Sequence, residues 1–316
     1  MMNRPQGPIA AALDIGSNTI KMLVVEKTPD GLKKLAENTS ETRISQGISQ
    51  EHPELTEASM SRALEVIGDL YREMRSFHPV FTRIVATSAV RDAANRSVFV
   101  GRVLEETGQH MDVISGEEEA QLIGKGVLTD PALVDQNEVM IFDMGGGSVE
   151  CIHLKNRTIE MAKSLPLGGV RLMEKHVADP SQPLTQNEKK RVIETVLEKV
   201  QELSLDIENP EKALAVGAGG TWVTSRAILA HRQGKTLSES SPYLTIEDMR
   251  SIFEEASNYS LDRRLQIPKL PPNRADVFPV TLLALITLSE WAGISQFYHC
   301  FHSLRYGVAY ELLRTT

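Results

Sequence analysis

The chain has 316 residues and a formal net charge of −8, an acidic balance that excludes a general nucleic-acid binder with its broad basic surface. Two cysteines, Cys151 and Cys300, are too few for a disulfide framework, and no apolar run is long enough to cross a bilayer. The amino end lacks the long apolar region of a secretory signal, so we expect a cytoplasmic protein without membrane partners.

The first predicted element is a buried strand that ends in a glycine turn. The stretch Ala11 to Thr19 reads AALDIGSNT, and a second apolar run, Ile20 to Glu26, follows it. Asp14 at the strand end suits a cation, bound directly or through water. The backbone amides of the turn suit phosphate and come from Gly16, Ser17 and Asn18.

Strands and helices alternate in the region that follows, which predicts a layered α/β architecture. Thr56 caps an amphipathic helix, and a strand at Arg83 to Thr87 leads into a helix that stops at Gly108. The short strand Met111 to Ser115 precedes another helix.

Three consecutive glutamates begin that helix. Ser115 and Glu118 have capping-box spacing, which predicts that Glu118 is occupied with the backbone of the turn. Successive helical residues point about 100° apart, so Glu119 faces elsewhere. A glutamate aimed at a bound phosphate could orient and deprotonate water, an effect typically worth ~10² to 10⁴ in rate.

The strand-and-turn motif recurs as VMIFDMGGGS from Val139 to Ser148, before the apolar run Val149 to Leu154. Asp143 takes the place of the first aspartate. The turn offers further phosphate contacts through Gly145, Gly146, Gly147 and Ser148.

Later segments are less regular. Thr185 and Glu188 have capping-box spacing ahead of a helix, and Leu237 to Asn273 is expected to be helical with loops, with a cap at Thr245. Between them, the strand Ala213 to Val216 runs into GAGGTWVTSRAIL. This segment lacks the lysine of a P-loop, but amides at its helix start suit phosphate through Gly217, Gly219, Gly220 and Thr221.

Seven segments in order carry a family resemblance: DIGSNT, ATSAVRDAAN, ISGEEEAQLIGKGV, FDMGGGSVE, SLPLGGVRL, GAGGT and LPPNRADVFP. Together they resemble the exopolyphosphatase and guanosine pentaphosphate phosphohydrolase family. The resemblance implies two ribonuclease H-like α/β lobes of the actin, sugar kinase and heat-shock ATPase superfamily, with the phosphate site in an interlobe cleft. We expect the lobes at residues 1–133 and 134–316, with the last helix packing back across the lobe junction.

The resemblance also assigns roles. It aligns the catalytic glutamate with Glu119 and the arginine of the ATSA-x-R segment with Arg91, a second catalytic residue that contacts phosphate and stabilises charge on the transferred group. It places a divalent metal, Mg²⁺ with Mn²⁺ as the alternative, at Asp143 and Glu150 with Asp14. An arginine fork fits phosphate oxygens in two directions. Weaker candidates for the same contact are Arg43, Arg171, Arg274 and Arg305.

The chain departs from the family pattern at two places. Cys300 to Gly307 reads CFHSLRYG and lacks the aspartate that often precedes the final LR-x-G, which puts the role of Arg305 in doubt. Trp222 replaces a small residue, and it either narrows the pocket or packs between the lobes. His299, Cys300 and His302 lack a matching distant pair of ligands, so we expect them to pack and not to bind zinc.

The primary functional hypothesis is hydrolysis of terminal phosphate from inorganic polyphosphate by glutamate-activated water. Guanosine pentaphosphate hydrolysis is the nearest alternative, because the relatives divide between the two substrates. An actin-fold kinase and a non-catalytic polyphosphate or nucleotide sensor remain open, and so does a homodimer.

Overall fold

The computed structural model describes residues 7–201, 203 and 213–314. These residues form two compact units. Unit 1 comprises the described residues of Met1–Asp135 and of His302–Thr316, and unit 2 comprises those of Gln136–Phe301. The carboxyl-terminal helix thus belongs with the amino-terminal sheet. The expected lobes were residues 1–133 and 134–316, with this last helix packing back across the lobe junction.

Unit 1 is built on a mixed sheet that has five strands among the described residues, in the order β3-β2-β1-β4-β5. The first three strands form an antiparallel meander, and β4 and β5 continue the sheet in parallel with β1. Its strands are β1 (Ile9–Ile15), β2 (Thr19–Thr28), β3 (Gly31–Glu41), β4 (Phe81–Ala86) and β5 (Met111–Val113). Its helices are α1 (Glu57–Arg75), α2 (Ser88–Asp92), α3 (Arg96–Thr107), α4 (Gly116–Val127), the 3₁₀ turn η1 (Pro131–Leu133) and α11 (Leu304–Leu313).

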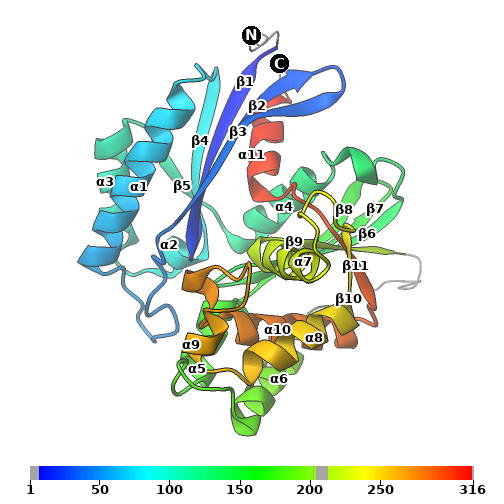
Figure 1. The fold of residues 1–316 in the computed structure, drawn as a ribbon. Coiled ribbons are helices and arrows are strands. Elements are labelled where there is room, and N and C mark those ends of the chain that lie inside the picture. Colours follow the sequence, from blue (N-terminus) through cyan, green and yellow to red (C-terminus); the bar gives the residue numbers. More distant parts are fainter. Residues whose placement is uncertain (1–6, 202, 204–212, 315–316) are drawn as a thin grey trace. The chain divides into compact units, whose positions relative to one another are not determined.

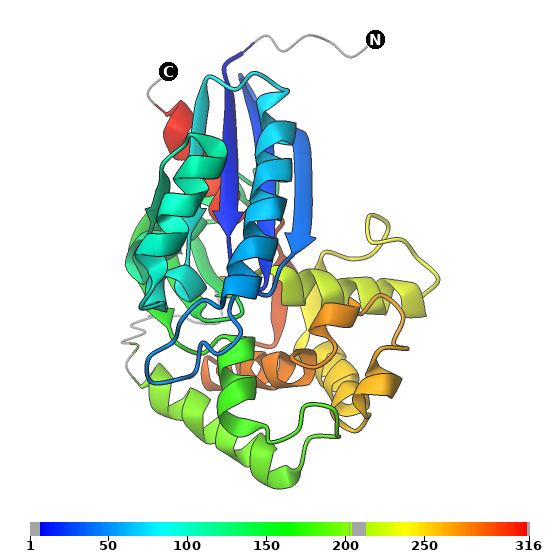
Figure 2. The ribbon, with the colours of Figure 1, turned by 90° about the vertical axis from the view of Figure 1, so that its left-hand side faces the viewer.

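Helices cover both faces of this sheet. Figure 1 shows α1 and α3 on one face and α4 and α11 on the other, and Figure 2 shows α1 and α3 in front of the strands. The helix α11 packs closely on α4, because Gly307 and Gly126 bring the two backbones together without side chains between them. The carboxyl-terminal residues therefore help to hold α4 in place.

Unit 2 repeats the same strand plan with one addition. Its sheet has six strands among the described residues, in the order β10-β11-β9-β6-β7-β8, and β6, β9 and β11 are parallel. Its strands are β6 (Glu138–Met144), β7 (Val149–Lys155), β8 (Thr158–Leu165), β9 (Leu214–Ala218), β10 (Tyr243–Thr245) and β11 (Gln296–His299). Its helices are α5 (Gly169–His176), α6 (Gln186–Val200), α7 (Gly220–Arg232), α8 (Ile246–Ser257), α9 (Leu261–Arg264), the 3₁₀ turn η2 (Pro272–Arg274) and α10 (Phe278–Trp291).

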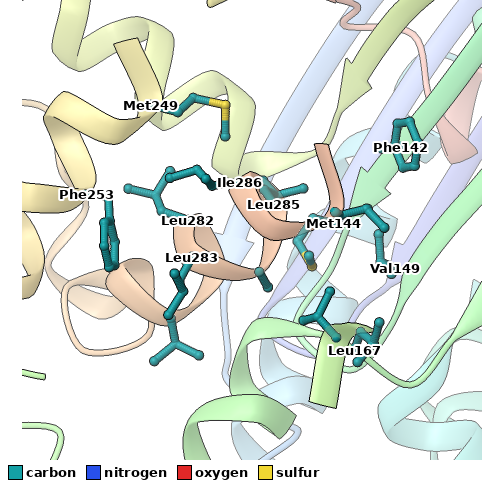
Figure 3. Close-up of a cluster of buried hydrophobic side chains, with 14 of the residues drawn as sticks. Phe142, Met144, Val149, Leu167, Met249, Phe253, Leu282, Leu283, Leu285 and Ile286 are labelled. Carbon is teal, nitrogen blue, oxygen red and sulfur yellow. The ribbon is translucent and has the colours of Figure 1, made fainter. Parts of the chain in front are cut away.

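A meander followed by parallel strands in both units confirms the expected pair of ribonuclease H-like α/β lobes. The core of unit 2 is centred on α10, which is apolar on all sides and is packed by α5, α6, α7 and α8. Figure 3 shows Leu282 and Ile286 of α10 beside Met249 of α8, and Leu285 beside Met144 at the end of β6. This core fixes the strand end that carries the second glycine turn.

Predicted caps account for several helix boundaries. The side chain of Thr56 accepts from Ser59 N at the start of α1, and Gly108 ends α3 in the left-handed conformation with φ 67°. Thr185 and Glu188 form a complete capping box at α6, as predicted. None of the helices in the described ranges combines the length and apolar character that crossing a bilayer requires.

Candidate functional site

The first glycine turn closes the β1–β2 hairpin of unit 1. Gly16 N donates to Thr19 O at 3.0 Å, while Ser17 O and Asn18 O accept hydrogen bonds from the segment that follows β3. Within residues 7–201, 203 and 213–314, the amides of Ser17 and Asn18 have no protein acceptor. The carbonyls are thus used by the protein, and the amides are available to an anion.

The second glycine turn, at the β6–β7 hairpin of unit 2, has the same construction. Gly145 N donates to Ser148 O at 2.9 Å, and the first amides of α5 donate to Gly145 O and Gly146 O. Arg171 Nε donates to Gly147 O at 3.0 Å. The amides of Gly146 and Gly147 have no acceptor in the described part of the protein, so this turn also presents donors suited to phosphate.

Each turn follows an aspartate at the same place in its hairpin. Asp14 is opposite Lys21 on β2, whereas Asp143 is opposite Glu150 on β7. Glu150 is buried, and Ser164 Oγ donates to its Oε1 at 2.7 Å. Only the second hairpin therefore places two carboxylates side by side.

That pair fits a magnesium ion, which is commonly held by one or two carboxylates and takes its other ligands from water and substrate phosphates. A fully protein-built metal centre is not found, because the described residues contain no group of three or more His, Cys, Asp or Glu arranged to hold an ion. The residues covered by this finding include His299, Cys300 and His302.

Three parallel strands of unit 1 end at one edge of the sheet. Ile15 is in register with Ala86 on β4, and Ala86 is in register with Val113 on β5. The bonds Thr87 N to Ile15 O and Ile114 N to Ala86 O extend this alignment beyond the strands. The glycine turn, α2 and α4 therefore all begin at the carboxyl ends of the strands, where ligands bind in open α/β sheets.

Arg91 of α2 and Glu119 of α4 meet at this edge. Arg91 Nη1 donates to Glu119 Oε2 at 2.9 Å and to Ile114 O at 3.1 Å. Glu119 is only 7% exposed. The two predicted catalytic residues thus form a mostly buried ion pair that limits the rotamers of both side chains.

The neighbouring glutamate behaves differently from the sequence prediction. Ser115 Oγ accepts from Glu118 N at 3.0 Å, but Arg83 Nη2 donates to the carboxylate of Glu118 at 2.8 Å. The capping box is therefore only half formed, since a strand residue distant in sequence offers the carboxylate a charged partner. Glu118 is exposed and Glu119 is buried, which agrees with the expected difference in direction.

The start of α7 lies beside the second aspartate. Asp143 is in register with Ala218, and Gly219, at φ 97°, approaches so closely that a Cβ there would overlap Asp143 Oδ1. A Cβ on Gly220 would overlap the guanidinium of Arg274. Unit 2 therefore brings together Asp143, this predicted phosphate-binding segment with its buried Thr221, and Arg274.

Gly217 has a packing role. It lies within β9, and a Cβ there would overlap the ring of Trp222. Trp222 is fully buried, donates from Nε1 to Phe142 O at 3.2 Å and lies 4.4 Å from the Phe297 ring. This tryptophan is thus part of the core of unit 2.

Two other candidate arginines differ in their surroundings. Arg43 lies against the first turn, where its amide donates to Asn18 O at 3.1 Å. Arg305 donates from Nη1 to Met22 O at 2.8 Å and from Nη2 to Glu37 at 2.7 Å, which ties α11 to β2 and β3. Burial by itself would raise the pKa of Glu37, but the bonds and charges of Lys34 and Arg305 lower it below its ordinary value. The structure gives Arg305 a structural role.

Two parts of the site were not identified from sequence. Thr42 and Ser45 lie against the first turn and are almost completely buried. Gly168 lies against the second turn, where a Cβ would overlap the backbone of Gly146 and Gly147. The double glycine of SLPLGGVRL was a usable signal for the close approach, whereas nothing local distinguishes Thr42 and Ser45.

Comparison with known proteins gives consistent results. A family model described as the Ppx/GppA phosphatase family matches residues 23–316. Two relatives named guanosine-5'-triphosphate,3'-diphosphate pyrophosphatase are 27% and 29% identical, from Photobacterium profundum and Aeromonas hydrophila. The alignments cover 99% and 97% of this chain but 61% and 60% of the relatives, so the chain spans about three fifths of their length.

Solved structures show the same fold. An exopolyphosphatase from Cytophaga hutchinsonii superimposes with a TM-score of 0.87 at 24% identity, covering 98% of each chain. A Ppx/GppA family member from Aquifex aeolicus has a TM-score of 0.78 at 24% identity and covers 98% of this chain and 99% of its own. At this identity the likeness establishes the architecture and leaves the chemistry to the residues.

Proposed function

Because this chain belongs to the Ppx/GppA phosphatase family, we propose that it is a metal-dependent phosphoanhydride hydrolase that releases terminal phosphate from inorganic polyphosphate. The observation that carries the proposal is the buried Glu119 carboxylate held by Arg91 at 2.9 Å, at the sheet edge where the first turn has unused amides. An anion site and a fixed carboxylate at one sheet edge suit attack by water on phosphorus.

In this mechanism Glu119 orients a water molecule and accepts its proton as the water oxygen bonds to the terminal phosphorus. The bond from that phosphorus to the bridging oxygen breaks, and the shortened chain leaves with the bridging oxygen. Arg91 Nη2 makes no hydrogen bond within the described residues, so it is available to the charge on the transferred group. The unused amides of Ser17 and Asn18 in the first turn hold non-bridging oxygens.

Asp143 and Glu150 are the residues that would hold Mg²⁺, with Mn²⁺ as the alternative. When bound, the ion supplies positive charge that offsets the negative charge of the phosphate oxygens. Asp14, opposite a lysine on β2, has no adjacent carboxylate on that strand. It is the weaker metal ligand.

Hydrolysis of guanosine 5'-triphosphate 3'-diphosphate is the second candidate function. The names of the relatives favour it, and the amides of the turns would bind its 5'-phosphates by the same hydrogen bonds. Nothing in the two turns distinguishes a nucleotide triphosphate from the end of a polymer.

Orthophosphate release from each substrate, measured side by side with Mg²⁺ and with Mn²⁺, tests the proposal. We expect release from both substrates, with the higher kcat/KM for polyphosphate. A higher kcat/KM for the guanosine compound would reverse the order of the two functions. No release from either substrate with either metal would overturn both.

A further inference from the structure

The segment directly after β3 forms one side of the first glycine turn. Thr42 N donates to Asn18 O and Ser45 N donates to Ser17 O, each at 3.1 Å. Thr42 is 5% exposed, Ser45 2% and Asn18 9%, so their polar side chains are removed from bulk water. Three polar side chains, those of Asn18, Thr42 and Ser45, are therefore buried close to the two amides that have no acceptor in the described protein.

These side chains also lack partners within the protein. Thr42 Oγ1, Ser45 Oγ and Asn18 Oδ1 are buried and have no hydrogen-bond partner among the described residues. Leaving a buried polar atom unpaired is costly, and such atoms in folded proteins call for an explanation. These three unpaired atoms belong to two segments whose backbones are hydrogen-bonded to each other. Together they point to a hydrogen-bond partner that comes from outside the protein.

Backbone strain at the same place supports this interpretation. Arg43, between the two hydroxyl residues, has a left-handed conformation with φ 47°. A residue with a side chain adopts this conformation at an energetic cost, and such strain gathers at ligand clamps. Here it accompanies the bond from Arg43 N to Asn18 O, which keeps the segment against the turn.

We infer that Thr42 and Ser45 are specificity-determining residues, whose hydroxyls donate to phosphate oxygens of a bound oligophosphate beside the amides of Ser17 and Asn18. The inference rests on the proposed function for its ligand class. Hydroxyls rotate to suit an acceptor, and the oxygen and nitrogen of the Asn18 amide can exchange places to provide a further donor. The subsite therefore recognises phosphate by neutral hydrogen bonds, without adding charge.

The test removes the hydroxyls of Thr42 and Ser45 and keeps the size and shape of the side chains nearly the same. Thr42→Val, Ser45→Ala and the double variant are made in a Glu119→Gln background that prevents turnover, and the Kd for tripolyphosphate is measured by calorimetry. We expect each single substitution to weaken binding by ~10-fold, because each removes a hydrogen bond to a charged group. The Tm without ligand should equal or exceed that of the parent, since an unpaired buried hydroxyl has been removed. Thr42→Ser, which keeps the hydroxyl, should bind like the parent.

Two matched controls make the same chemical change elsewhere. Thr82 Oγ1 in β4 and Ser257 Oγ in α8 are also buried without a partner in the described residues. Thr82 is in register with Ala11, toward the opposite end of β1 from the glycine turn. Thr82→Val and Ser257→Ala should leave the Kd unchanged.

Unchanged affinity of the double variant for tripolyphosphate would overturn the inference. A fall in Tm well beyond that of the controls would also overturn it, because it would show that the hydroxyls stabilise the folded protein. A parallel titration with guanosine 5'-triphosphate 3'-diphosphate should show the same loss. A loss confined to the guanosine compound would contradict the oligophosphate assignment. If the chain releases no phosphate but the hydroxyls control tripolyphosphate affinity, the proposed hydrolysis fails and the subsite stands.

Discussion

Arg91 Nη1 bridges the carboxylate of Glu119 and the carbonyl of Ile114, at 2.9 Å and 3.1 Å. One guanidinium nitrogen thus connects the helix after β4 to both the end of β5 and the start of α4. Because Glu119 is nearly buried, this contact is central to the position of the proposed general base.

Replacing Arg91 tests that role. Arg91→Met weakens the electrostatic compensation of a buried carboxylate, so we expect the free energy of unfolding to fall by about 2–4 kcal/mol and phosphate release to fall with it. Urea titration and initial rates measure the two effects. The control is Arg102→Met, which removes an exposed pair with Glu57 and should change little. Equal effects of the two substitutions would contradict a special role for Arg91.

The close packing of α11 on α4 predicts a strong effect at Gly307. A Cβ there would overlap the carbonyl oxygen of Leu122, so Gly307→Ala must push the two helices apart. We expect a loss of about 1–3 kcal/mol in the free energy of unfolding and a lower kcat, because α4 carries Glu119. Gly101→Ala in α3, where a Cβ meets nothing within 4 Å, should instead stabilise by about 0.5–1 kcal/mol. A neutral Gly307→Ala would rule out this packing.

Replacing Gly219 should impair Mg²⁺ binding, an effect that replacing another glycine with positive φ should not have. Gly219→Ala puts a side chain at φ 97° and ψ 175°, a conformation essentially confined to glycine, at a cost of about 1–3 kcal/mol, and it also displaces the carboxylate of Asp143. Gly234, at φ 67° with open space around its Cβ position, would suffer the strain alone. We expect both alanine variants to lose stability, Gly219→Ala the more, but only Gly219→Ala to need more Mg²⁺ for half-maximal rate. Identical Mg²⁺ titrations would argue against Asp143 as a ligand.

The carboxyl-terminal segment should make stability depend on pH. Burial lowers the pKa of His302 below its ordinary value and Lys34 adds to the shift, while Asp130 and Glu37 oppose it. As the pH falls, His302 in the unfolded state therefore takes up a proton near the ordinary histidine pKa of about 6.5, before His302 in the folded state does. The free energy of unfolding then decreases as the pH drops below that value. His302→Gln should lose less stability between about pH 7.5 and 5.5 than the parent. A loss as large as that of the parent would show that other groups cause it.

Much of the fold was predictable, because its signals are local. Both glycine turns, the capping box at Thr185 and the helix stop at Gly108 depend on residues close together in sequence, and the structure shows each of them. The edge strands β3 and β8 were not predicted, since exposed strands lack a clear apolar pattern. Each of them pairs through a short hairpin with the strand before it, β3 with β2 and β8 with β7.

The site was predictable only where its chemistry is carried by a motif. Glu119 and Arg91 follow from the resemblance, and the structure places them in contact. The partner of Glu118, the buried position of Trp222 and the bonds of Arg305 to β2 and β3 all depend on contacts between distant segments. The same holds for the unpaired hydroxyls of Thr42 and Ser45, because burial is a property of the folded chain.

The most direct test of the central claim compares Glu119→Gln with Glu118→Gln, the same change at the exposed neighbour. The rate of orthophosphate release from polyphosphate is measured with Mg²⁺ at saturating substrate. We predict that Glu119→Gln lowers kcat by ~10² to 10⁴ while polyphosphate binding is retained, and that Glu118→Gln releases phosphate at nearly the parental rate. Unchanged release by Glu119→Gln would contradict the proposed mechanism.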